Sequence, residues 1–240
     1  GLGLPILEAI TYDKKIVFDY LLKEFKAPLN DYKEWVDTVN AVDIWLENEK
    51  ENFEFGKVLM SMVTKAREIN SILFNSLDRD FKFYLLKNSI GFLSLKDAPI
   101  VLDNSVHSLK KEFLKDGFDD TLDNLSASYL VKSLDKIKDD LTVYYNGQKG
   151  LMTYCLGAIS IPANSFLRAN SDYDFFIDVG RKGNASFRAD GKLDVSQLAS
   201  KLANGGGHVN ASGCKFDDFI DTINLQEVRA YIQNKLNNLK

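Results

Sequence analysis

The spacing of apolar residues changes near Leu141, and this change constrains the fold more than any other feature. Before Leu141, apolar residues recur roughly every three to four positions, which is typical of amphipathic helices. After it, short apolar runs alternate around turn residues, which is typical of paired strands. The sequence therefore predicts an α/β protein with a mostly helical first part and a small α+β domain with a mixed sheet.

Three segments in the first part have a helical repeat of apolar residues. They cover residues 14–25, 31–46 and 53–74. In the second segment, Trp35 and Val39 share one face with two further apolar residues. We expect each of the three segments to form a helix that buries its apolar face against neighbouring elements.

The chain of 240 residues is long enough for one large or two modest domains, and long enough to bury a core. Residues 1–94 are predicted to be the helical portion of the first domain, and residues 141–240 to be the second domain. Between them, residues 95–140 are rich in Lys and Asp and show little sustained alternation. We predict that this stretch is a linker with one or two short helices.

The second part contains two hairpin patterns. Asn146-Gly147 joins the first pair of predicted strands, and Asn-Gly is a strong signal for a tight hairpin turn. Residues 180–184 form the predicted turn of the second hairpin. Asp194 is placed to cap a following amphipathic helix, and residues 225–236 predict a closing helix.

A run of glycines follows the capped helix, in the stretch NGGGHVNASGCKF. Gly205, Gly206 and Gly207 precede His208 and Asn210. One reading is structural, because glycine reaches positive φ at little cost and commonly ends helices. The other reading is functional, because bare residues let the backbone approach a ligand and point N–H groups at phosphate oxygens. The sequence leaves both open.

Arg188 lies in the predicted strand just before that helix. If this strand lies beside the glycine loop, Arg188 and His208 converge on one pocket. A guanidinium makes forked contacts with phosphate, and an imidazole exchanges protons near neutral pH. Asn210 could contact the substrate or lock the loop.

The net charge of −4 argues against a protein that coats duplex DNA, which would be basic. A small anionic ligand at a local basic site is compatible with it. Cys155 and Cys214 form no metal-ligand pattern and are expected to be reduced thiols in a cytoplasmic protein. No apolar run has the length of a membrane span, and the first residues do not resemble a secretory signal.

The order of these motifs resembles the DHH-associated substrate-binding domain, which ends many DHH-family phosphoesterases. The similarity covers roughly residues 141–240, with the Ser-Phe-Arg strand at residues 186–188, the helix opened by Asp194, and GGGHVNASG. In that family the domain holds the nucleotide end of the substrate beside a two-metal domain. The resemblance implies that the substrate-binding residues are Arg188, Gly205, Gly206, Gly207, His208 and Asn210.

AVDIW, residues 41–45, resembles a motif of the nanoRNase branch of this family, in which the aspartate is a metal ligand. The resemblance implies that Asp43 is a metal ligand, in a two-metal Mn²⁺ or Mg²⁺ site of the complete enzyme. The residue alone also allows an aspartate at a helix end or paired with a lysine. The chain has no His-His pair, since its two histidines are His107 and His208. We therefore expect that it starts after the missing motifs and is inactive alone.

Three hypotheses follow. The first is the C-terminal region of a manganese-dependent phosphodiesterase or exonuclease that hydrolyses short oligoribonucleotides, linearised cyclic dinucleotides or a bisphosphorylated nucleotide. In it, this chain supplies substrate binding. The second is a non-catalytic RNA- or nucleotide-binding module related to the C-terminal domain of alanyl-tRNA synthetase. The third is a protein whose glycine loop is purely structural. Cleavage polarity and homodimer formation are left open.

Overall fold

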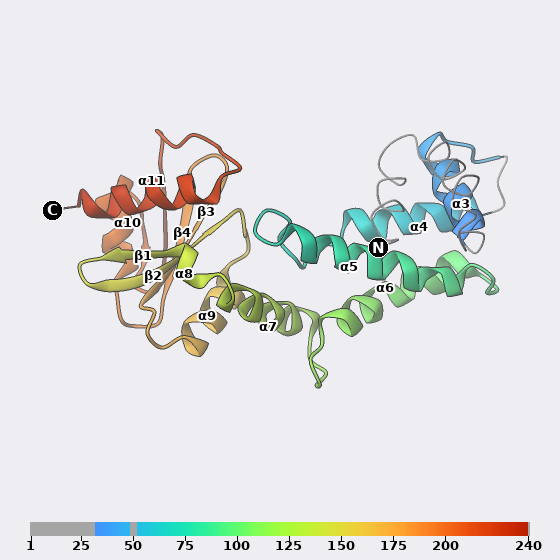
Figure 1. The fold of residues 1–240 in the computed structure, drawn as a ribbon, viewed down its shortest axis with the longest axis horizontal. Helices are drawn as coiled ribbons and strands as arrows, with labels where there is room; N and C mark the ends of the chain where they lie inside the picture. The colour runs from blue at the N-terminus through green and yellow to red at the C-terminus, as the bar shows by residue number, and fades with distance from the viewer. Residues whose placement is uncertain (1–31, 49–51, 240) are drawn as a thin grey trace. The chain divides into compact units, whose positions relative to one another are not determined.

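The fold is α/β, with helices in the first part of the chain and a six-stranded mixed sheet in the second (Figure 1). This confirms the predicted fold class. The structure is a computed structural model, and it describes residues 32–48 and 52–239. The helix predicted at residues 14–25 lies outside the described residues. None of the described helices is both long and apolar enough to cross a membrane.

The first unit is helical. Its described elements are α3 (Lys33–Asp43), α4 (Phe53–Thr64), α5 (Asn75–Ser89), the 3-10 helix η2 (Ile90–Phe92) and α6 (Ala98–Leu114). Helix α4 packs against both α3 and α6. Gly56 allows the close approach of α3, because a Cβ there would lie 2.7 Å from the carbonyl oxygen of Thr38. The indole of buried Trp35 donates to the hydroxyl of Ser89 at 3.3 Å.

The helix predicted at residues 53–74 is too long, because α4 ends at Thr64. Beyond that end, Asn70 organises a turn within the predicted range. Its side-chain oxygen accepts hydrogen bonds from the amides of Ile72 at 2.9 Å and Leu73 at 2.8 Å. Such a local side-chain turn competes with helical hydrogen bonding.

The second unit contains the sheet. Its elements are α7 (Leu122–Asp135), α8 (Lys138–Leu141), β1 (Thr142–Tyr145), β2 (Gln148–Tyr154), α9 (Ser160–Ala169), β3 (Phe175–Val179), β4 (Asn184–Ala189), α10 (Val195–Ala203), β5 (Gly206–His208), β6 (Ala211–Lys215) and α11 (Leu225–Asn237). The strand order is β1-β2-β3-β4-β6-β5. Among the described strands, only β2 and β3 pair in parallel, and α9 makes the crossover between them. Both predicted hairpins are confirmed, as β1–β2 and β3–β4.

The chain crosses between the two compact units more than once. Residues 1–68 and 76–114 belong to the first unit, and residues 69–75 and 115–240 to the second. The stretch predicted as a linker, residues 95–140, contains α6 of the first unit together with α7 and most of α8 of the second.

The two faces of the sheet have different helical cover, as Figure 1 shows. Helices α10 and α11 pack on one face, where the hydroxyl of Ser212 on β6 donates to the carbonyl of Val195 at 2.6 Å. Helix α9 packs on the other face, and its Phe166 meets Phe176 of β3 edge to face at 5.9 Å. Residues of β4, β5 and β6 on this second face are half-buried or exposed, so the face is open there.

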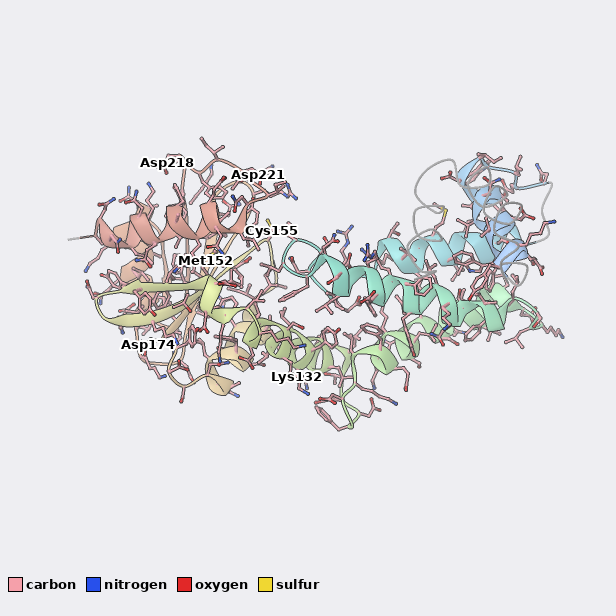
Figure 2. The ribbon with its side chains drawn as sticks, in the orientation of Figure 1. Lys132, Met152, Cys155, Asp174, Asp218 and Asp221 are labelled. Carbon is pink, nitrogen blue, oxygen red and sulfur yellow. The ribbon has the colours of Figure 1, made fainter. Side chains whose placement is uncertain are left out.

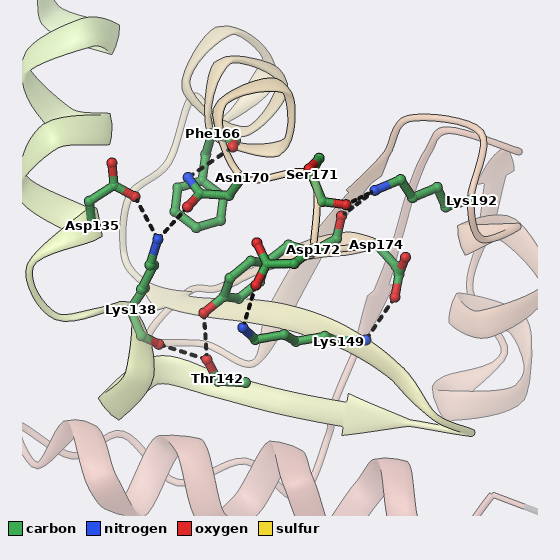
Figure 3. A network of polar contacts seen from close by, with 11 residues as sticks. Asp135, Lys138, Thr142, Lys149, Phe166, Asn170, Ser171, Asp172, Asp174 and Lys192 are labelled. Atoms are coloured by element: carbon green, nitrogen blue, oxygen red, sulfur yellow. Dashed lines mark hydrogen bonds and ion pairs between the residues drawn. The ribbon is translucent and has the colours of Figure 1, made fainter.

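Two lysines fix the segment that leads from α9 into β3 (Figure 3). Lys149 donates to Asp172 at 2.6 Å and lies 4.0 Å from the ring centre of Tyr173. The hydrogen bond between Lys149 and Asp172 raises the pKa of Lys149 and lowers that of Asp172. Lys192 donates to the carbonyls of Ser171 and Tyr173. These contacts hold the chain where β3 enters the sheet beside β2.

One edge of the sheet is covered by a side chain of α11. Gln233 accepts a hydrogen bond from the amide of Tyr144 at 2.8 Å and donates to the carbonyl of Tyr144 at 2.9 Å. The amide group of Gln233 therefore pairs with β1 as the backbone of another strand would.

Candidate functional site

The pairing of three strands brings Arg188 and His208 into one row of the sheet. Arg188 on β4 pairs with Ala211 on β6, and Ala211 pairs with His208 on β5. Directly opposite residues on paired strands present their side chains to the same face. Two strand spacings separate Arg188 from His208, or roughly 10 Å between Cα atoms. The guanidinium and the imidazole thus project from one face, with only a methyl group between them.

The next row on this face has almost no side chains. Ser186 pairs with Gly213, and Gly213 pairs with Gly206. A Cβ at Gly206 would meet nothing within 4 Å, and the residue is exposed. An open floor of backbone therefore lies beside Arg188 and His208.

Packing within the second unit explains why the other two positions of the run are glycines. A Cβ at Gly205 would lie 2.3 Å from the carbonyl oxygen of Gly213. A Cβ at Gly207, whose φ is +144°, would lie 2.6 Å from a carbonyl oxygen of β6. The amide of Gly205 donates to the carbonyl of Ala199 at 3.0 Å, so it serves the end of α10. The structural reading thus accounts for Gly205 and Gly207 and leaves Gly206 without an internal reason.

The charge of Arg188 is held in place by neutral groups. Its Nη2 donates to the hydroxyl of Ser160 at 2.9 Å, and its Nη1 donates to the carbonyl of Phe187 at 2.8 Å. Within residues 32–48 and 52–239, Arg188 makes no ion pair. A half-buried guanidinium with a fixed orientation, and with no carboxylate partner among the described residues, is suited to bind an anion.

Asn210 locks the turn beside this row. Its side-chain oxygen accepts a hydrogen bond from the amide of Gly191 at 3.0 Å. Its carbonyl accepts one from the amide of Ala189 at 3.1 Å. Of the two roles that the sequence leaves open for Asn210, the structure shows the locking of the loop.

Helix α10 places the glycine run, and its capping is confirmed. Asp194 accepts hydrogen bonds from the amides of Ser196 at 3.0 Å and Gln197 at 3.1 Å. The Gln197 side chain donates back to Asp194 at 2.9 Å, which completes the box-like start. The hydroxyl of Ser196 is the main cause of the lowered pKa of Asp194.

Asp178 on β3 presents its side chain to the same face of the sheet as Arg188, because Asp178 pairs with Ser186 of β4. Its Oδ1 accepts from the hydroxyl of Thr153 at 2.9 Å and from the amide of Leu156 at 3.0 Å. Its Oδ2 accepts from the amide of Gly157 at 3.0 Å. Burial raises the pKa of this carboxyl group.

The sequence predictions do not include Ser160 or Asp178 among the site residues. A signal existed for Asp178, since a carboxylate inside the apolar strand FFIDV costs free energy unless it is hydrogen-bonded. No local signal existed for Ser160, because its partner Arg188 lies 28 residues away along the chain.

The described residues do not supply the donors of a metal centre. Asp43, the predicted metal ligand, is the last residue of α3 and is exposed. Within the described ranges, no group of three or more His, Cys, Asp or Glu side chains could hold a metal ion. His107, on α6, is exposed and belongs to no such group. The role of Asp43 as a metal ligand stays a prediction.

Both cysteines are free. Burial raises the pKa of Cys155, and it raises the pKa of Cys214 to about 11. Figure 2 labels Cys155 at the end of β2. A thiol with a raised pKa is mostly protonated at neutral pH, so neither cysteine is suited to nucleophilic attack.

Comparisons with known proteins show which proteins the chain is similar to. No protein-family model matches the chain. Over 229 residues, the chain is 39% identical to the 3′,5′-cyclic-nucleotide phosphodiesterase of Helicobacter pylori (strain ATCC 700392 / 26695). This match covers 93% of the chain and 66% of the relative, so the chain spans just under two thirds of that protein.

Two solved structures were also compared. An uncharacterized protein from Helicobacter pylori G27 matches with a TM-score of 0.87 and 40% identity, over 94% of this chain and 67% of that one. A pGpG-specific phosphodiesterase from Vibrio cholerae matches with a TM-score of 0.30 and 15% identity, over 68% of this chain and 58% of that one. So low a score carries no argument. The identity to the two Helicobacter pylori proteins makes the chain their homologue.

Proposed function

We propose that the second unit is the phosphate-binding part of a nucleotide phosphodiesterase. The observation that carries the proposal is the row Arg188–Ala211–His208 beside the bare backbone at Gly206. The printed name of the 39% identical relative, a 3′,5′-cyclic-nucleotide phosphodiesterase, supports the same chemistry.

The row offers complementary contacts to a nucleotide. The N–H groups of Arg188 that do not bond to Ser160 and Phe187 bind a phosphate oxygen. His208 donates to the phosphate or to the ester oxygen from the other end of the row. Gly206 lets a sugar or phosphate approach the backbone without steric conflict. Such a site contacts a few nucleotides and gains nothing from a long duplex.

The proposed hydrolysis takes place in the complete enzyme with bound metal. Paired Mn²⁺ or Mg²⁺ ions would supply an activated hydroxide and would neutralise charge on the phosphoryl oxygens. Asp43 is the residue of this chain that we propose as a ligand. The role of the second unit is to bind and orient the substrate.

Four substrate classes remain in the proposal. Short oligoribonucleotides, linearised cyclic dinucleotides and a bisphosphorylated nucleotide carry a terminal phosphate monoester. A 3′,5′-cyclic nucleotide, which the relative's name suggests, carries only a cyclic diester. The monoester has a higher charge, and the guanidinium of Arg188, which has neutral partners in the part of the chain that the structure describes, favours it.

Arg188→Ala tests the proposal in the 240-residue chain. We expect this change to weaken binding of a 5′-phosphorylated dinucleotide by roughly tenfold or more, since it removes charge-assisted hydrogen bonds. Binding of the matching nucleoside should hardly change. Isothermal titration calorimetry measures both, with 3′,5′-cyclic AMP as a third ligand. Arg168→Ala is the matched control, because Arg168 is an exposed arginine of α9 outside the row.

The outcomes separate cleanly. A loss with Arg188→Ala and none with Arg168→Ala supports the phosphate site. Equal and small effects of both substitutions would overturn it.

A second candidate is a non-catalytic module that binds RNA or a nucleotide. The absence of a metal donor set among the described residues favours it for this chain. Hydrolysis assays of this chain and of the longer Helicobacter pylori 3′,5′-cyclic-nucleotide phosphodiesterase, each with and without Mn²⁺, decide between the two. Binding without turnover in both proteins supports the module.

A further inference from the structure

We propose that Asp178 is a positioning residue for the anion site, acting on Arg188 through the loop at residues 155–159 and Ser160. The inference rests on the proposed function of Arg188. It concerns how the guanidinium is aimed and why its charge is left for a ligand.

Asp178 holds the start of the loop at residues 155–159 by hydrogen bonds, and we call this contact the latch. Both oxygens of this carboxyl group accept backbone N–H groups, from Leu156 and Gly157, each at 3.0 Å. The chain reverses sharply there, because Cys155 and Gly157 have φ values of +57° and +85°. The carbonyl of Cys155 also accepts a hydrogen bond from Asn70 at 2.7 Å. The start of the loop is thus fixed on both sides.

The end of the loop carries this position to Arg188. Ile159, at the end of the loop, is only 2% exposed and anchors the start of α9. Ser160 follows it as the first residue of α9, and its hydroxyl accepts from Nη2 of Arg188 at 2.9 Å. The position of that hydroxyl depends on the loop because no side chain caps this end of α9.

Asp178 also lies close enough to affect the charge available at Arg188. Asp178 pairs with Ser186, two residues before Arg188 on the same face, so a free carboxylate there would be within reach of the guanidinium. Instead, two amides and the hydroxyl of Thr153 occupy its oxygens. Arg188 therefore has neutral partners, and its charge remains available to a phosphate.

Three variants of the 240-residue chain test the route. Ser160→Ala removes the acceptor that aims Arg188, Ser160→Thr keeps a hydroxyl at the same position, and Asp178→Asn weakens the latch. The probes are a 5′-phosphorylated dinucleotide and the same dinucleotide without the phosphate, measured by calorimetry. We expect Ser160→Ala and Asp178→Asn to weaken binding of the phosphorylated probe roughly five- to tenfold, as loss of one hydrogen bond of ordinary net strength implies.

The unphosphorylated probe should bind all variants alike, and Ser160→Thr should restore affinity to within about twofold of the wild type. Because both residues act along one route, the double variant should bind no more weakly than the weaker single variant. Additive losses would show that Asp178 does not act through Ser160. Thermal melts identify any variant that fails to fold. The comparison of Ser160→Ala with Ser160→Thr still decides whether the hydroxyl at position 160 positions Arg188.

Arg188→Ala separates the two proposals. If it leaves phosphate binding intact, the proposed function of the site is wrong. If it abolishes binding while Ser160→Ala does not change it, only the positioning role is wrong.

Discussion

Gly206 is the residue whose bare backbone has no explanation inside the second unit. A methyl group there would enter open space, whereas one at Gly207 would collide with β6 in a backbone conformation that disfavours side chains. We expect Gly206→Ala to change the free energy of unfolding by no more than about 0.5 kcal/mol. It should nevertheless weaken binding of a 5′-phosphorylated dinucleotide, because the methyl group occupies the floor of the site. Urea unfolding and calorimetry measure the two effects.

Gly207→Ala is the matched comparison for that variant. It should destabilise the protein by more than about 1 kcal/mol, through steric conflict and strained φ. If Gly206→Ala instead destabilises the protein as much as Gly207→Ala does, the glycine run is structural throughout.

Asp178 gives the stability of the protein a defined pH dependence. Burial raises the pKa of this carboxyl group, so the folded state holds its proton more tightly than the unfolded state does. The resulting stabilisation is fully present below the unfolded pKa of about 3.9, and it is lost as the pH rises through the folded pKa. We expect Asp178→Asn to remove this part of the pH dependence. Urea unfolding at several pH values above about 4 measures it.

Asp194→Asn is the control of opposite sign, because hydrogen bonding lowers the pKa of Asp194. Its contribution to stability is present above the unfolded pKa and is lost as the pH falls through the folded pKa. Identical pH slopes for the wild type and Asp178→Asn would contradict the assignment to Asp178.

Among single residues, the sequence predicted Arg188 and His208 from their order along the chain, and they lie in one row. It could not assign separate roles to the three glycines, because the contacts of a missing Cβ depend on which strand lies opposite. The sequence could not predict the role of Ser160 either, since its contact with Arg188 arises only when the sheet and α9 have folded together.

At the scale of elements, α10 is the helix that sets the position of the glycine run. Asp194→Ala removes the acceptor of two backbone amides at its start. We expect the melting temperature to fall by a few degrees, as is usual for loss of a helix cap. Lys201→Ala, an exposed change in the last turn of α10, is the control and should have little effect. Equal melting temperatures for both variants would show that the cap does not stabilise α10.

Elements with strong local signals were predicted well. The two hairpins, the capped helix α10 and the closing helix α11 are confirmed. The sequence did not predict α9, because Pro162 and Asn164 interrupt its pattern, although proline is tolerated in a first helical turn. It also did not predict β5, since glycine has low strand propensity and only the pairing with β6 makes these residues a strand.

At the scale of the whole molecule, we expect nucleotide binding and hydrolysis to be separable. We expect the purified 240-residue chain with added Mn²⁺ to bind a 5′-phosphorylated dinucleotide without cleaving it, because its described residues contain no metal donor set. Chromatography of the nucleotide products and elemental analysis of bound manganese measure both properties. Manganese-dependent cleavage that is lost in Asp43→Ala would contradict this expectation and would identify a metal site in the chain itself.

The contact of Gln233 with Tyr144 has a consequence for assembly. An unprotected outer strand invites a strand from a neighbouring molecule, which is a common route to aggregation. Here the donor and acceptor of Tyr144 are already satisfied, so a second copy could not add its own strand at this position without first displacing α11. Any self-association of this protein should therefore leave the β1 border of the sheet unshared.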